Sequence, residues 1–212
     1  MHVSADLPGA LSLSNIEFGF PGHTLFDGFS AVLTPGVNLV RGGDGRGKTS
    51  LLQLMAGQLP ARSGTLELNG VRLDLDSAAY RRQVFYIDPR TEAYDQATPP
   101  EVFAELQARH PSFDQSCIAA LCEGLSLTPH LEKKLFMLST GSKRKVYLAA
   151  ALAAGAALTL LDDPFASLDR ASINFVSAAL AAQAANPRQI WAVAMYETPA
   201  DITLATTIDL GD

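Results

Sequence analysis

The segment that most constrains the fold of this chain is a glycine-rich loop, Gly42-Gly43-Asp44-Gly45-Arg46-Gly47-Lys48-Thr49. In it a glycine and four free positions precede Gly-Lys-Thr, which is the pattern of a phosphate-binding loop. An apolar run of strand length at Val37 to Arg41 precedes the loop, and a helical pattern from Lys48 to Gly57 follows it. Glycine allows the backbone to wrap closely around phosphates with its N–H groups pointing inward. The motif therefore predicts a strand, a phosphate cradle and a helix in that order.

The chemistry expected of this P-loop follows from its residue types. The amino group of Lys48 would reach the β- and γ-phosphates, and the hydroxyl of Thr49 would bind Mg²⁺. The start of the following helix adds a partial positive charge. The sequence contains no Asn-Lys-x-Asp stretch of the kind that reads guanine, so we expect ATP. The expected nucleotide-binding residues here are Gly42, Gly43, Asp44, Gly45, Arg46, Gly47, Lys48, Thr49 and Ser50.

A second motif is the apolar run Leu158 to Leu161, which ends in Asp162-Asp163. It has the form of a Walker B strand. A carboxylate at the end of such a strand can hold Mg²⁺, and a second acidic group just after it can orient or deprotonate the attacking water. We therefore expect Asp162 to bind the metal with Thr49, and Asp163 to act in hydrolysis.

A third motif, Leu138-Ser139-Thr140-Gly141-Ser142, stands before a basic stretch and a helical pattern. Ser139 and the N–H groups after it, at a helix start, could form a second anion site, although Ser139 could also be an ordinary N-cap. Ser139 lies 23 residues before Asp162, and Ser167-Leu168-Asp169 follows where a D-loop is expected. With these motifs the chain resembles the ATP-binding cassettes of ABC transporters over essentially its whole length.

This resemblance implies a head-to-tail dimer of cassettes, either homodimer or heterodimer. The P-loop of one cassette and the signature of the other would enclose each ATP, so Ser139, Thr140 and Gly141 would serve the nucleotide held by the partner. Phe20 would stack on adenine, although a role in a core or hairpin is the alternative. The resemblance is greatest to the small ATPase subunits of bacterial exporters.

Three positions depart from the pattern of the family. Asp163 stands where the catalytic Glu is usual, Asp88-Pro89-Arg90 stands where a metal-contacting glutamine is usual, and Tyr196 occupies the place of the switch histidine. Loss of an oriented general base costs on the order of 10² to 10⁴ in rate. The hypothesis is an ATP hydrolase that binds ATP well and hydrolyses it slowly, with Lys48, Asp163 and Tyr196 as its catalytic candidates.

The alternation of strand-like and helical patterns predicts an α/β fold with a mainly parallel sheet and an N-terminal antiparallel part. We expect residues 1–212 to form a single cassette, with a core at about 1–90 and 155–212 and a small helical lobe at 91–154. The expected strands are 12–18, 37–41, 65–68, 84–87, 158–161 and 190–194. The expected helices are 48–57, 101–109, 113–123, 140–154 and 170–185.

Charge and hydropathy limit the possible partners. The chain has 16 Lys and Arg against 22 Asp and Glu, a net charge of −6, so binding of nucleic acid is not expected. The apolar run at 146–161 is shorter than the roughly 20 residues of a membrane span. We therefore expect a cytoplasmic protein, peripheral at the inner membrane through a separate permease. The alternative is a soluble regulatory or non-transport ABC ATPase. Five basic residues around the signature are expected on a solvated face: Lys133, Lys134, Lys143, Arg144 and Lys145.

Overall fold

The computed structural model of the chain describes residues 9–211 and has two sheets. The central sheet has the strand order β6-β7-β8-β3-β9, and each neighbouring pair is parallel. Its strands are Val84–Tyr86 (β6), Leu158–Asp162 (β7), Ile190–Met195 (β8), Gly36–Arg41 (β3) and Leu204–Asp209 (β9). The second sheet has the order β2-β1-β4-β5 and is antiparallel. Its strands are Leu11–Phe20 (β1), His23–Leu33 (β2), Ser63–Leu68 (β4) and Val71–Arg72 (β5). The predicted fold class is confirmed.

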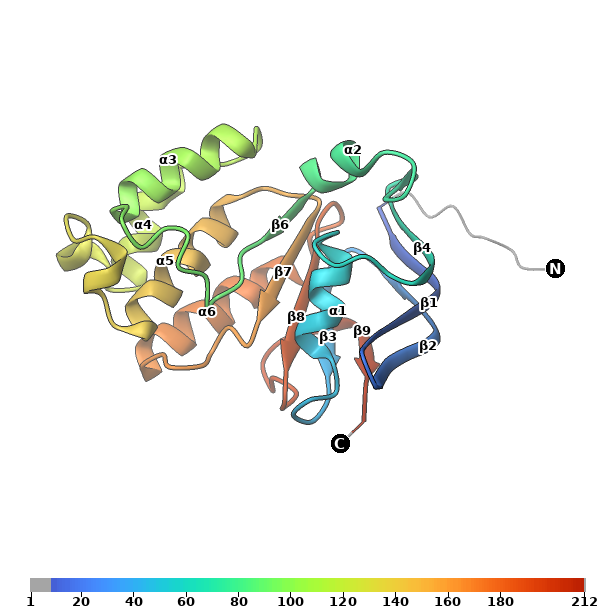
Figure 1. Cartoon of the computed structure of the whole chain (residues 1–212). Coiled ribbons are helices and arrows are strands. Elements are labelled where there is room, and N and C mark those ends of the chain that lie inside the picture. The colour runs from blue at the N-terminus through green and yellow to red at the C-terminus, as the bar shows by residue number, and fades with distance from the viewer. Residues whose placement is uncertain (1–8, 212) are drawn as a thin grey trace.

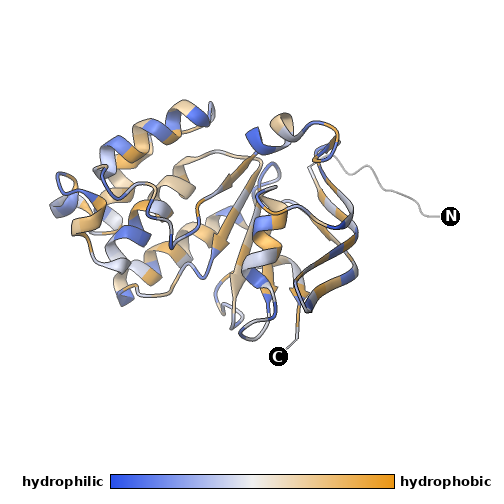
Figure 2. Ribbon diagram, viewed as in Figure 1, coloured by the Kyte–Doolittle hydropathy of each residue, from blue (hydrophilic) through white to orange (hydrophobic). Residues whose placement is uncertain are grey.

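Helix α1, Lys48–Met55, lies between the two sheets (Figure 1). Its buried leucines pack on one side against the antiparallel sheet and on the other against the parallel sheet. Figure 2 shows apolar residues concentrated along the central strands. The helix that begins at the P-loop is thus fixed from both sides, which also fixes the loop.

Successive side chains along the central strands point to opposite faces of the sheet, so the core is divided into two hydrophobic clusters. In β8, Trp191 and Val193 pack with the helices on the far face, whereas Ala192 and Ala194 face α1. Both sides of β8 are buried throughout, and the first four residues of β7 are buried as well. This agrees with the prediction, made from their continuous apolar runs, that these strands are covered on both faces.

Helices α3 (Pro99–Arg109), α4 (Ile118–Gly124), α5 (Thr140–Ala153) and α6 (Arg170–Gln183) cover the other face of the sheet. In Figure 1 they lie on the opposite side of the parallel strands from β1 and β2. Between β6 and β7 the described chain contains helices and short 3₁₀ turns but no strand. The division into a core and a lobe stays a prediction. None of the helices in residues 9–211 combines the length and apolar content that a membrane crossing requires.

Some elements differ from the sequence prediction. Strand β2 was not predicted, because Asp27-Gly28 in its middle is a turn signal; in the structure Gly28 has a φ of +66° and β2 pairs with β1 through shifted registers. Strands β5 and β9 and the six-residue helix α2, Ser77–Arg82, were not predicted either. The helix expected at 113–123 begins only at Ile118, because Asp114 accepts a hydrogen bond from the Ser116 N–H and starts a 3₁₀ turn first.

Candidate nucleotide-binding site

The P-loop connects the end of β3 to the start of α1. Gly45 and Gly47 have φ values of +76° and +91°, a left-handed conformation that favours glycine. A Cβ on Gly47 would also lie 3.2 Å from the ring of Phe26. No side chain caps the N-terminus of α1. Its first N–H groups are therefore left for an anion, as the motif predicts.

The segment after β9, residues 210–211, packs against the start of the P-loop. The Gly43 N–H donates to the carbonyl oxygen of Gly211 at 2.8 Å. A Cβ on Gly42 would lie 3.0 Å from the Cβ of Leu210, so this glycine is needed for close approach rather than for its dihedral angles. The sequence carries no local signal for this support, because the two segments are far apart along the chain.

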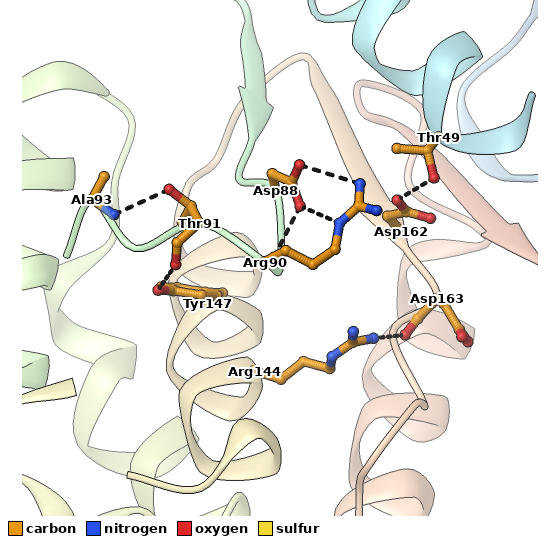
Figure 3. Close-up of polar contacts among 9 residues, drawn as sticks. All are labelled: Thr49, Asp88, Arg90, Thr91, Ala93, Arg144, Tyr147, Asp162 and Asp163. Atoms are coloured by element: carbon orange, nitrogen blue, oxygen red, sulfur yellow. Dashed lines mark hydrogen bonds and ion pairs between the residues drawn. The ribbon is translucent and has the colours of Figure 1, made fainter. Parts of the chain in front are cut away.

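The P-loop and the Walker B strand meet through side chains. Thr49 Oγ1 donates a hydrogen bond to Asp162 Oδ2 at 2.7 Å, as Figure 3 shows. Lys48 Nζ donates to the carbonyl oxygens of Gly42 and Gly43, at 2.6 and 2.8 Å, and so lies over the loop. Burial raises the pKa of Asp162, and the bond from Thr49 opposes this shift. The predicted metal pair, Thr49 and Asp162, is therefore assembled.

The chemistry of this pair fits Mg²⁺. Hydroxyl and carboxylate oxygens are the hard ligands that this ion prefers, and it takes few of them from protein when phosphates and waters supply the rest. Residues 9–211 hold no group of three or more acidic, His or Cys side chains that could form a complete metal site.

A pocket of about 400 Å³ opens above the P-loop. It is lined by Phe20, His23, Leu25, Gly43, Asp44, Gly45, Gly47, Lys48, Thr49, Ser50, Asp162 and Asp163. Among the predicted binding residues of the loop, Gly42 and Arg46 do not line it. His23 and Leu25 were not predicted, since they belong to the unpredicted strand β2, where His23 pairs with Phe20. The pairing of β1 with β2 is what brings them to the pocket.

Phe20 stands at the outer rim of this pocket. Its side chain is 49% exposed, and its ring meets Phe18 edge to face with the centroids 5.3 Å apart. Phe20 is therefore not a core residue. It lines the pocket, and its contact with adenine stays a prediction.

Asp163 follows Asp162 in an unusual backbone conformation, with a φ of +47°. Its N–H donates to the carbonyl oxygen of Ala194 at 2.9 Å, and its own carbonyl accepts from the Arg144 guanidinium (Figure 3). Two neighbouring elements, β8 and α5, thus hold its backbone. Asp163 lines the pocket, whereas Tyr196 is 62% exposed and does not. The catalytic roles of both residues stay predictions.

The signature segment lies outside the P-loop pocket. Ser139 caps α5, its Oγ accepting from the Ser142 N–H at 3.1 Å, which is the N-cap alternative left open by the sequence. A Cβ on Gly141 would overlap the carbonyl oxygen of Ser167 in the D-loop. Gly141 is therefore required for close packing of α5 on the D-loop. The nucleotide contacts of Ser139, Thr140 and Gly141 stay predictions.

The expectation of a solvated basic face is wrong for three of its five residues. Lys145 is 8% exposed and pairs with Asp169 at 2.5 Å. Lys143 pairs with Asp95 at 2.6 Å, and Arg144 donates to the backbone of Asp163. The acidic partners lie 24 and 48 residues away in the sequence, so only the fold brings them to α5.

The residues after β6 form a compact charged turn. The Asp88 carboxylate accepts from the Arg90 N–H at 2.9 Å and from its guanidinium at 3.2 and 3.4 Å. In Figure 3 the guanidinium of Arg90 extends toward Asp162. The hydrogen bond and charge of Asp88 raise the pKa of Arg90, and the charge of Asp162 raises it further. In turn, the positive charge of Arg90 opposes the upward shift that burial gives to the pKa of Asp162.

Comparison with known proteins decides the family. The family model described as "ABC transporter" matches residues 30–166, from β2 to beyond the Walker B strand. The chain belongs to the ABC transporter family. Residues 30–166 include the P-loop, the signature and the Walker B carboxylates, so the three motifs on which the resemblance depended lie inside the match.

Relatives support the same assignment. The chain is 32% identical over 197 residues to "Cytochrome c biogenesis ATP-binding export protein CcmA" of Paramagnetospirillum magneticum, covering 91% of this chain and 89% of that one. The protein of the same name from Pseudomonas syringae is 34% identical, covering 72% of each chain. "Fe(3+) ions import ATP-binding protein FbpC 2" of Rhodococcus jostii is 35% identical, covering 83% of this chain and 53% of that one.

The fold of an ABC cassette is also found among solved structures. The putative ABC transporter ATP-binding protein from Pyrococcus furiosus superposes with a TM-score of 0.78 at 20% identity, covering 95% of this chain and 97% of that one. At this identity the likeness concerns the fold alone. It shows that the two sheets and the helical part are arranged as in an ABC cassette.

Proposed function

We propose that this ABC protein is the ATP-binding subunit of a transporter, which binds MgATP above its P-loop and drives a separate membrane permease. The observation that carries the proposal is the hydrogen bond from Thr49 to Asp162, which joins the P-loop to the Walker B carboxylate within one pocket. Relatives named as export proteins match over most of their length, which supports the exporter type.

In the proposed mechanism, the N–H groups of the P-loop and of the start of α1 bind the phosphates, and Lys48 contacts the β- and γ-phosphates. Thr49 and Asp162 would hold Mg²⁺, which neutralises developing phosphate charge when bound. Asp163 orients water and accepts its proton. Its side chain is one methylene shorter than that of Glu, so it holds the water less closely and hydrolysis is slow.

The proposed active assembly is a head-to-tail dimer in which Ser139, Thr140 and Gly141 face the nucleotide of the partner. Their position outside the P-loop pocket of their own chain supports this arrangement. Tyr196, at the end of β8, takes the place of the switch histidine. The dimer would sit at the cytoplasmic side of the inner membrane, against its permease.

A second candidate is a soluble regulatory or non-transport ABC protein that uses ATP for dimerisation. The charged turn at Asp88 and Arg90 favours this candidate. Members of the family usually have a glutamine here that contacts both the metal and the permease, and this chain lacks it. Co-expression with a candidate permease and purification in detergent separates the two functions: a transporter subunit copurifies with its permease, and a soluble regulator does not.

The test of the proposed site uses ATP binding and phosphate release by the purified chain and two variants. We expect the wild type to bind ATP and release phosphate slowly, Lys48→Ala to lose binding by about 100-fold or more, and Asp163→Glu to release phosphate about tenfold faster. Brisk turnover by the wild type with no gain in Asp163→Glu would contradict slow hydrolysis. ATP binding that is unaffected in Lys48→Ala would contradict the site itself.

A further inference from the structure

Arg90 puts a positive charge beside Asp162, in the segment where the family usually has a neutral glutamine. Arg90 belongs to the turn after β6, and β6 is the parallel neighbour of β7. Tyr86 pairs with Leu160 in these parallel strands. Asp88 and Asp162 each come two residues later, so they lie at the same end of the two strands. Topology thus brings the charged turn to the metal end of the nucleotide site.

Asp88 holds the Arg90 guanidinium in a defined position. One carboxylate oxygen accepts from both the backbone N–H and Nε of Arg90, at 2.9 and 3.2 Å, and the other lies 3.4 Å from Nη2. Pro89 between them restricts the backbone of the turn. Although the side chain of Arg90 is 68% exposed, it is tethered at both its backbone and its head group.

The tether leaves part of the guanidinium available. A guanidinium has five N–H donors, and Asp88 engages only the Nε and Nη2 side of the fork. In Figure 3 the head group reaches from Asp88 toward Asp162, and Asp162 is already engaged by Thr49. Asp162 lines the P-loop pocket and Arg90 does not, so the remaining donors lie just outside the pocket, beside its Asp162 end.

We propose that Arg90 contacts the terminal phosphate of a nucleoside triphosphate held by the P-loop, with Asp88 holding the guanidinium in place. The inference rests on the proposed function, since it assumes that the pocket binds a nucleotide. A planar guanidinium suits phosphate oxygens, to which it can donate two parallel hydrogen bonds. A diphosphate ends one phosphate earlier, so the contact discriminates ATP from ADP.

The same charge has an opposite effect on the metal. A cation close to Asp162 repels Mg²⁺ while it attracts the negative triphosphate. Compared with a neutral residue at this place, Arg90 makes ATP binding less dependent on Mg²⁺ and makes recruitment of Mg²⁺ weaker. The two effects have opposite signs, so they can be separated from a general loss of folding or affinity.

The test measures equilibrium binding of ATP and ADP, first in EDTA and then over a range of Mg²⁺ concentrations, for the wild type and Arg90→Gln. In EDTA we expect Arg90→Gln to weaken ATP binding by about tenfold, the usual scale of a hydrogen bond to a charged group at an exposed site, and to change ADP binding by less than about twofold. The Mg²⁺ concentration at half-saturation should fall in the variant. None of these readouts requires turnover.

Two further variants keep the test specific. Arg82→Gln removes an equal charge from the last turn of α2. It should leave the affinity for ATP, the affinity for ADP and the Mg²⁺ concentration at half-saturation unchanged. Arg90→Lys keeps the charge without the planar guanidinium. Its Mg²⁺ concentration at half-saturation should therefore stay at the wild-type value, while its preference for ATP over ADP should be partly lost. Equal losses of ATP and ADP binding in Arg90→Gln, or no change in either, would overturn the inference. If the wild type binds no ATP, or binds it independently of Lys48, the proposed function fails instead.

Discussion

Two helix N-termini in this protein carry glycines for different physical reasons. At the start of α1, Gly47 is required by its left-handed φ of +91°, and no side chain caps the helix. At the start of α5, Gly141 is required because a Cβ would overlap the carbonyl oxygen of Ser167, and Ser139 caps the helix. Within residues 9–211, no side chain caps the N–H groups at the first terminus. At the second, the Ser142 N–H is engaged by the Ser139 side chain, and the helix start packs against the D-loop.

The strongest break in this comparison is expected at α1. Gly47→Ala places a Cβ in a left-handed conformation, at a cost of about 1–2 kcal/mol, and pushes it toward Phe26. Because the strain falls on the phosphate cradle, ATP binding should weaken by about 10- to 100-fold. Titration with a fluorescent ATP analogue measures this. Unchanged affinity would show that the loop conformation does not limit binding.

The matched substitution at the start of α5, Gly141→Ala, should lower the stability of the chain rather than its affinity for ATP. Gly141→Ala must move the D-loop away from α5, at a cost of about 1–3 kcal/mol for overpacking. ATP binding by the single chain should stay within about twofold of the wild type, while the urea midpoint of unfolding falls. A loss of ATP affinity as large as that of Gly47→Ala would contradict the separation between the two termini.

The smallest effect is expected at the ion pair that fastens α5 to α6. The hydrogen bond from Lys145, followed by the N–H of Ser172, lowers the pKa of Asp169. A carboxyl whose pKa is lowered by folding adds stability above its unfolded pKa of about 3.9, and this contribution is lost as the pH falls through the lower, folded value.

Asp169→Asn should therefore lower the urea midpoint modestly at pH 7, and the difference from the wild type should shrink below about pH 4. Urea unfolding at a series of pH values measures this. Asp76→Asn is the matched control, because it removes a carboxylate that caps the short helix α2 through the Ala79 N–H, away from α5 and α6. A difference that stays constant down to pH 3 would mean that the charge of Asp169 contributes nothing.

Much of the parallel sheet could be predicted because its strands are marked locally. The buried runs of β7 and β8 are apolar on both faces, and β3 is followed at once by the P-loop. Strand β2 could not be predicted, since its Asp27-Gly28 turn signal is absorbed as an irregularity of the pairing with β1. His23 and Leu25 reach the pocket only because that pairing forms. A prediction of the site from motifs therefore missed one of its walls.

The sequence by itself determined the phosphate-binding chemistry of this protein and its family, because the P-loop, signature and Walker B motifs are local patterns with fixed spacing. Tertiary structure alone decided which side chains meet. Thr49 and Asp162, which share a hydrogen bond, are 113 residues apart in the sequence, Lys145 pairs with Asp169, and the Arg90 turn lies near Asp162 because β6 and β7 are neighbours. Residue type sets what a group can bind, but the free energy of that binding depends on distance, burial and neighbouring charge, which only the packed chain fixes.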